Sequence, residues 1–246
     1  PAGAVLATYD LIYGSDHANA GSVGTHTDFR DITIGDGDLF VADTGDNALV
    51  RDGSVAPKPV IYRFAEPTDF TATTATVKKI YEVTFSDNKQ HSVAAVAFDP
   101  VGGDLYLFTK ETTSNANTDP HHTFVYKIAS ADLLKAATAG IVTVTAKKDA
   151  TIGPNSLDGT WINAGGISAA DISSDGRLII VRDTAEFNIN NTAWTHHAKF
   201  WIRDIGETVA EALAKAPKEA KLPAVVDEPH GTGIAFNPNV SGYGYH

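Results

Sequence analysis

The segment DITIGDGDLFVAD, residues 31–43, contains an apolar strand, a tight turn of Asp and Gly, and a second apolar strand. The same order recurs as VAAVAFDPVGGDLYLF in residues 93–108 and as AADISSDGRLIIV in residues 169–181, and a fourth copy begins as GIAFNPN in residues 233–239. A hairpin that recurs about every 60 to 75 residues cannot bury its own faces, so the copies must pack on one another. The repetition therefore predicts a β-propeller, in which the start of every inner strand lies at one central axis.

The whole chain, residues 1–246, is predicted to form a single all-β domain, a β-propeller of about four blades. The repeats span residues 30–85, 93–147, 167–226 and 232–246. The fourth repeat contains only two inner strands. A strand near residues 4–12 belongs to no repeat, and we expect it to complete the fourth blade, so that the N- and C-terminal strands close the ring. The alternative is that the chain is part of a larger ring, of about five or six blades.

Helix is expected in only two short segments. Residues 130–136 begin with Ser130, a residue type that commonly caps a helix N-terminus. Residues 208–216 are rich in Ala, Glu and Lys, which favour helix.

The composition excludes several classes of partner. A net charge of −11 and a pI near 5.1 disfavour nucleic acid, because phosphate binding needs clustered Lys and Arg. The sequence has no apolar run of about 18 residues, so no membrane span is expected. The absence of cysteine excludes a disulfide framework and a thiolate metal site. Methionine is absent too, and a chain without either sulfur residue resists oxidation, which favours a secreted, periplasmic or cell-surface protein.

The chain resembles a group of bacterial exported propeller proteins whose second blade follows the pattern DWEDI…LYVGDIGDN…R…YR.PEP. The matching segments are Asp31-Ile32, residues 39–47, Arg51, residues 61–63, Glu66-Pro67, residues 99–110, residues 170–176, residues 206–213 and residues 231–236. The resemblance implies a propeller fold and export, and it carries no activity with it.

Departures from that group concern the axis of the ring. The group places Glu in three inner strands, whereas Arg30, Ala94 and Thr232 occupy those positions here. The resemblance therefore implies that an acidic channel has been lost. His91 and His230 stand beside two of these positions, so the chemistry at the axis is expected to have changed.

Three histidines precede the inner strands at similar distances. His26, His91 and His230 lie six, five and four residues before the apolar positions that align the repeats, Ile32, Val96 and Ile234. Neutral imidazoles that converge at an axis would bind zinc or copper, and Asp28 would serve as a further ligand or as a partner of one. The alternative is that these are three solvated loop histidines that never meet.

A second candidate site contains Trp194 and His196. Adjacent histidines on a strand point to opposite faces, so only one of His196 and His197 can join a shared site. A Trp two residues before a His is also the spacing that surface copper proteins of methanotrophs use. The alternative interpretation places these residues in the loops and edges of the outer hairpins.

Acidic residues gather at the first turn and after the second strand. The calcium candidates are Asp36, Asp38, Asp43, Asp46 and Asn47, which offer the oxygen ligands that hard cations prefer. Because Asp and Gly are also the usual turn residues, the alternative is that Asp46 and Asn47 cap the backbone of their own loop.

These features favour an exported, non-catalytic propeller that binds copper or zinc through axial histidines. No nucleophile elbow, His-Glu-x-x-His motif or Gly-rich phosphate loop occurs. One alternative is a hydrolase supported by calcium, although the loss of axial Glu residues argues against it. The other is a module that binds protein or glycan at the cell surface through exposed aromatics such as Trp194, Tyr243 and Tyr245.

Overall fold

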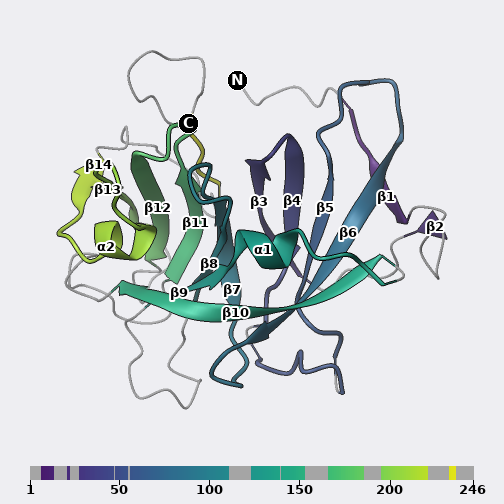
Figure 1. Cartoon of the computed structure of the whole chain (residues 1–246), viewed down its shortest axis with the longest axis horizontal. Helices are drawn as coiled ribbons and strands as arrows, with labels where there is room; N and C mark the ends of the chain where they lie inside the picture. Colours follow the sequence, from purple (N-terminus) through teal and green to yellow (C-terminus); the bar gives the residue numbers. More distant parts are fainter. Residues whose placement is uncertain are drawn as a thin grey trace.

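The computed structural model of the chain describes residues 7–13, 21–22, 28–46, 48–54, 56–110, 123–138, 140–152, 166–185, 195–220 and 233–236. Over these residues the protein is all-β, as the sequence predicts, and the helices there are two short ones (Figure 1). Three successive segments each form a four-stranded antiparallel meander. These meanders cover the residue ranges of the first three predicted repeats, and we refer to them as repeat one, repeat two and repeat three.

Repeat one contains β3 (Phe29–Gly35), β4 (Asp38–Asp43), β5 (Val60–Ala65) and β6 (Thr74–Phe85). The β3–β4 turn consists of Asp36 and Gly37, whose φ angles are 52° and 73°. Two residues with positive φ form the turn that matches the twist of a β-hairpin, and Asp-Gly is a preferred sequence for it. The turn residues seen in the sequence therefore set the register of the first two strands.

Repeat two contains β7 (Val93–Phe98), β8 (Leu105–Thr109), β9 (Thr123–Ile128) and β10 (Ile141–Ile152). The outer strand β10 changes partner along its length. Its first half pairs in parallel with β6, and its second half pairs antiparallel with β9. Repeats one and two therefore share one sheet, in the order β3-β4-β5-β6-β10-β9-β8-β7, which curves into a nearly closed barrel-like arrangement (Figure 1).

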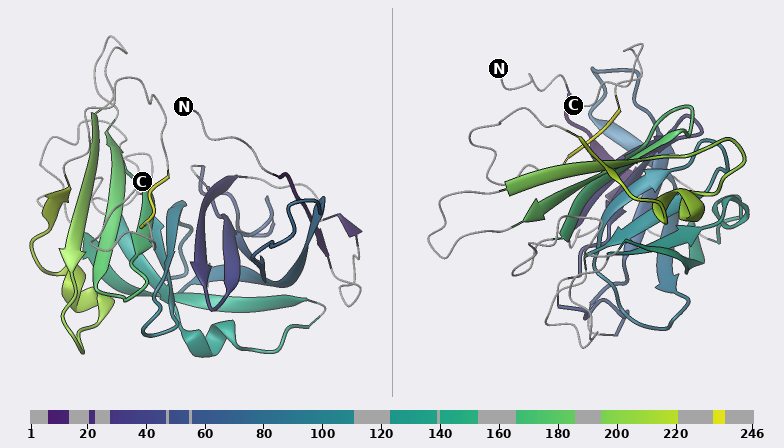
Figure 2. Two further views of the ribbon diagram at one scale, coloured as in Figure 1. Left: turned by 90° about the horizontal axis from the view of Figure 1, so that it is seen from above. Right: turned by 90° about the vertical axis from the view of Figure 1, so that its left-hand side faces the viewer.

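Repeat three forms a separate sheet of β11 (Gly166–Ile172), β12 (Leu178–Ala185), β13 (Thr195–Ile202) and β14 (Lys218–Ala220). This sheet lies on one side of the molecule and repeat one on the other, with β7 and β8 between them (Figure 2). The repeats are thus stacked in chain order.

Both helices lie within the predicted segments, as α1 (Ser130–Leu133) and α2 (Val209–Leu213). Thr208 caps α2 through a reciprocal pair of hydrogen bonds with Glu211. The prediction that Ser130 is the cap of α1 is wrong. Ala129 occupies the cap position, and the Ser130 amide donates instead to the Asp104 carboxylate, which replaces a local cap.

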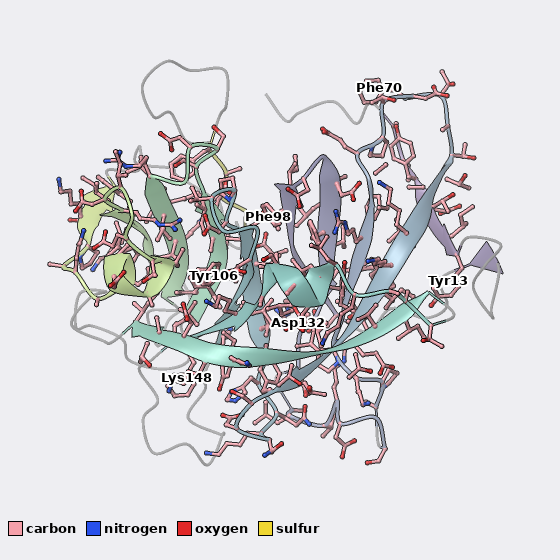
Figure 3. All side chains as sticks on the ribbon, viewed as in Figure 1. Tyr13, Phe70, Phe98, Tyr106, Asp132 and Lys148 are labelled. Carbon is pink, nitrogen blue, oxygen red and sulfur yellow. The ribbon has the colours of Figure 1, made fainter. Side chains whose placement is uncertain are left out.

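The hydrophobic core lies between the repeats. Phe98, near the middle of the molecule in Figure 3, stacks on Phe40 at 5.7 Å between ring centroids and belongs to the cluster between repeats one and two. Tyr106 belongs to the cluster between repeats two and three. Trp201 is buried in that second cluster, and its indole N–H donates to the Lys215 carbonyl. Repeats one and two, and likewise repeats two and three, thus bury apolar surface against each other.

The strand predicted near residues 4–12 pairs with a different part of the protein than predicted. Among the described residues it is β1 (Asp10–Tyr13), which pairs in parallel with β6 and antiparallel with β2 (Gly21–Ser22). Leu11 and Tyr13 pack on a cluster that includes Tyr62 and Phe64 of repeat one. These apolar contacts, with the free edge of β6, draw β1 to the outer strand of repeat one and away from the fourth repeat.

In the part of the chain that the structure describes, neither helix has the length and apolar character needed to cross a membrane.

Candidate functional site

The inner strands β3, β7 and β11 meet at the Asp31 carboxylate. Its Oδ1 accepts a hydrogen bond from the Ile32 amide at 2.9 Å, and its Oδ2 accepts one from Val96 of β7 at 3.0 Å. The amide of Ala170 in β11 also donates to it. One carboxylate of repeat one therefore contacts the backbone of all three inner strands.

Asp171 has the same role in repeat three. Its carboxylate accepts from the Ile172 amide at 2.9 Å and from the Phe236 amide at 2.8 Å. Phe236 belongs to the start of the predicted fourth repeat. Asp31 and Asp171 thus each connect an inner strand to the backbone of the following repeat.

Burial dominates the ionisation of both carboxyl groups. It raises the pKa of Asp31 from 3.8 to about 7, against the opposing effect of the three amide donors, and the Asp171 charge adds to the rise. Burial also raises the pKa of Asp171. Sequence reasoning missed both residues as site candidates. The available signal was the Asp-Ile pair, which occupies the same register at residues 31–32 and 171–172.

The calcium candidates that the structure describes have other partners. Asp43 forms a buried ion pair with Arg51, with 3.0 Å between Oδ1 and Nη1, and accepts the Asp28 amide. Asp46 accepts the amides of Val50 and Arg51 at 2.8 and 2.9 Å. Asp46 therefore caps its own loop, as the alternative interpretation of this motif predicts.

The calcium candidate at the end of the first turn, Asp38, is also paired with basic side chains of the protein. Asp38 is buried and binds both Arg63 and Lys78. Burial opposes its ionisation, but these two cations hold its pKa below the usual range. Asp36 lies exposed in the turn itself. Asn47 lies outside the described residues.

Asp28 pairs with Arg30 at the start of β3. This pair lies against Gly45, where an added Cβ would overlap the Asp28 carboxylate and the Arg30 side chain. The glycine in the DTGDN segment is therefore required by the close approach of the pair. The Asp28 side chain, which the sequence predicts as a metal ligand, is thus already paired with the Arg30 guanidinium.

His91 lies two residues before β7 and is fully buried, with its ring edge-on to Phe85. Its Nε2 lies 2.9 Å from Oδ2 of Asp87 and 2.8 Å from the Tyr126 hydroxyl. The hydroxyl also donates to Oδ2 of Asp87 at 2.9 Å. Burial opposes the ionisation of Asp87, but hydrogen bonds from His91, the Lys89 amide and Tyr126 hold its pKa below the usual value. We call these three residues the Asp87–His91–Tyr126 triad.

Sequence reasoning selected His91 but missed its partners. Asp87 lies only four residues before it in the turn after β6, which is a detectable spacing. Nothing in the sequence pointed to Tyr126, which comes from β9.

The remaining predicted residues are mostly outside the described ranges. His26, His230 and Trp194 lie there, so the convergence of the three histidines stays a prediction. His196 lies in β13, opposite Thr184 of β12. Over the described residues, no group of three or more His, Cys, Asp and Glu side chains could hold a metal ion.

No protein-family model matches this sequence, and no curated protein matches it either. The site must therefore be interpreted from its own geometry.

Proposed function

We propose that the chain is a non-catalytic β-propeller that binds a copper ion through His91. Two features support a propeller: the meanders stack in chain order, and Asp31 and Asp171 each join an inner strand to the next repeat. In a ring of blades, equivalent residues on successive inner strands recur around the axis.

A non-catalytic role is supported by the partners of the acidic residues. Asp43 neutralises the buried Arg51, Asp38 pairs with Arg63 and Lys78, and Asp46 satisfies backbone amides. Asp31 has the raised pKa that a general base needs, but its oxygens accept backbone amides of the inner strands. These carboxylates act in the assembly of the repeats.

The observation that carries the proposal is the convergence of the triad: the Asp87 oxygen, the His91 nitrogen and the Tyr126 oxygen lie 2.8–2.9 Å from one another. These are hydrogen-bond distances, so a metal ion would replace the protons that the three groups share. A ligand set of one imidazole nitrogen and two oxygens, without sulfur, is typical of Cu(II).

The surroundings of the triad supply orientation and access. Phe85 and Phe124 contact the His91 ring edge-on, with centroids 4.9 and 6.0 Å away, and so fix the direction of Nε2. The Asp87 side chain is about one-third exposed, at 33%. A metal ion would therefore enter from the side of the turn that carries Asp87.

Copper titration of tag-free protein tests the proposal, followed by calorimetry and electron paramagnetic resonance. We expect one equivalent of Cu(II) with a nitrogen ligand in the spectrum. Tyr126→Phe keeps the packed ring and removes only the hydroxyl, so it and Asp87→Asn should weaken binding at least about tenfold. Asp36→Asn, in an exposed turn of the same acidic chain, is the matched control and should leave binding unchanged.

Two results would overturn this ligand set. Binding that survives in both Tyr126→Phe and Asp87→Asn, but is lost in His26→Ala and His230→Ala, would assign the metal to the axial histidines. Full binding by a folded His91→Gln variant would remove His91 from the site, and with it the proposal.

A further inference from the structure

The chain contains four Asp-Gly pairs, and the structure describes three of them, at residues 36–37, 52–53 and 175–176. In an Asp-Gly pair the backbone amide nitrogen of the Gly can react with the Asp carboxyl group, because Gly has no side chain to hinder the approach. The three pairs have the same two reacting groups, so the fold decides how freely each pair reacts.

The pair in the β11–β12 turn is held at both reacting groups. The Asp175 carboxylate accepts from the Ser173 hydroxyl at 2.6 Å and from the Arg177 amide at 3.0 Å. The Gly176 amide donates to the Ser173 carbonyl at 2.7 Å. Gly176 also lies against the Val101 side chain. This pair must lose several contacts before it can react.

The pair in the loop after β4 is held in the same way. The Asp52 carboxylate accepts from the amide of Ser54 at 2.7 Å and also from its hydroxyl. The Gly53 amide donates to the Ala56 carbonyl at 2.9 Å. Both reacting groups are therefore occupied here too.

The pair in the β3–β4 turn differs from the other two. Over the described residues, neither the Asp36 carboxylate nor the Gly37 amide has a hydrogen-bond partner. Both residues are exposed, and a Cβ added to Gly37 would meet no atom within 4 Å. Nothing in this part of the chain thus holds the two reacting groups apart.

We propose that Asp36–Gly37 is a self-modification site, at which Asp36 converts to isoaspartate. The Gly37 nitrogen attacks Cγ of Asp36: a C–N bond forms, the carboxyl C–OH bond breaks, and the hydroxyl leaves as water with the amide proton. The cyclic succinimide then takes up one water. Opening at Cγ restores Asp36, and opening at the α-carbonyl leaves the chain linked through Cγ with a free α-carboxylate. The net change is an isomerisation, so it needs no oxidant or reductant.

Isoaspartate at this position would loosen the first hairpin. It adds one main-chain carbon to a turn of two residues, and the turn fixes the register of the strands. Gly35 and Asp38 form the closing pair. Asp38 is buried and lies 2.7 Å from Arg63, so its displacement would also disturb this ion pair. The exposed α-carboxylate suits a carboxyl methyltransferase specific for isoaspartate. This inference is independent of copper binding.

Peptide mapping of wild-type protein stored in H₂¹⁸O tests the proposal. A protease that cleaves before Asp but not before isoaspartate distinguishes the two forms, and each succinimide that opens takes up one heavy oxygen. Because the other pairs must first lose their hydrogen bonds, we expect isoaspartate at residue 36 at least about ten times faster than at residues 52 and 175. In urea, where these contacts are absent, the three rates should be similar.

Two outcomes of the mapping would overturn the proposal. One is a rate at residue 36 no faster than at residues 52 and 175. The other is a preference for residue 36 that persists in urea, because neighbouring residues in the sequence would then account for it.

Two further measurements keep the test decisive. Stored Asp36→Asn is the positive control, since Asn forms the same succinimide by losing ammonia, and a folded variant that gives no isoaspartate would show that the turn prevents ring closure and would overturn the proposal. The isoaspartate form, separated by ion exchange, should unfold at a lower urea midpoint than the unmodified protein. An equal midpoint would overturn the effect on the hairpin.

Discussion

Replacing Asp31 with Asn should remove the part of the pH dependence of stability between about pH 4 and pH 7 that comes from this carboxyl group. The Asp31 carboxyl has a pKa of about 7 in the folded protein, against 3.8 in an exposed chain. The folded state therefore holds this proton more tightly than the unfolded state does. Stability from this group is fully present below about pH 4, falls as the pH rises through 7, and is constant above that.

The size of the effect follows from the same two values. One pKa unit corresponds to about 1.4 kcal/mol, so the change from 3.8 to about 7 gives an upper limit of about 4 kcal/mol. Asp31 keeps partial solvent exposure, and solvent screening brings the expected loss to about 2–3 kcal/mol. Asn keeps one acceptor oxygen, but its amide group faces an N–H donor, which costs about 1–3 kcal/mol at every pH.

Urea unfolding of both proteins from pH 4.5 to pH 8.5 measures this effect. Histidines and other carboxylates contribute equally to the pH dependence of both proteins, so their contribution is removed when the free energy of unfolding of Asp31→Asn is subtracted from that of the wild type. We expect Asp31→Asn to be clearly less stable at pH 4.5 and to match or exceed the wild type at pH 8. A difference that stays constant over this range would refute the argument that burial controls this carboxyl group.

Three further substitutions test the other contacts by urea unfolding. Asp46→Ala loses two amide partners and should cost about 2 kcal/mol with no dependence on added calcium. Asp36→Asn should stay within about 0.5 kcal/mol, because Asn tolerates the positive φ of this turn position. Arg203→Ala breaks a buried ion pair with Asp99, 2.8 Å long, that joins repeats two and three; a loss of about 3–5 kcal/mol is expected, and one below about 1 kcal/mol would contradict it. Gly45→Ala should cost about 1–3 kcal/mol by displacing the Asp28–Arg30 pair. An unchanged midpoint of urea unfolding would contradict this, because it would show that the loop accommodates the added methyl group without cost.

Much of the fold could be predicted from the repeats because the relevant signals are local. The Asp-Gly turn at residues 36–37 sets a hairpin by itself, and the apolar runs on both sides must be buried. The position of β1 could not be predicted in this way. Its apolar residues suit any free edge, and the choice of β6 depends on side chains such as Tyr62 and Phe64 that come from elsewhere in the chain.

The candidate site was predictable only in part for the same reason. His91 was recognisable from its register before β7, and Asp87 lies close to it in sequence. Tyr126 is brought to them by the pairing of β9 with β8 and β10, which no local pattern encodes. Asp31 resembles an ordinary strand residue in the sequence, and only the approach of β7 and β11 makes it a junction.

The parallel pairing of β6 with β10 also affects how the molecule opens. Because this ladder joins repeats one and two through their backbones, neither can unfold alone without breaking it. Over the described residues, repeat three forms its own sheet and is held by packed side chains, the Arg203–Asp99 pair and the hydrogen bond from the Ala170 amide to Asp31. Repeat three can therefore open as a separate cooperative unit, with its amide hydrogens exchanging before those of β6 and β10. Duplication or exchange of this repeat during evolution would leave the paired sheet of the first two repeats intact.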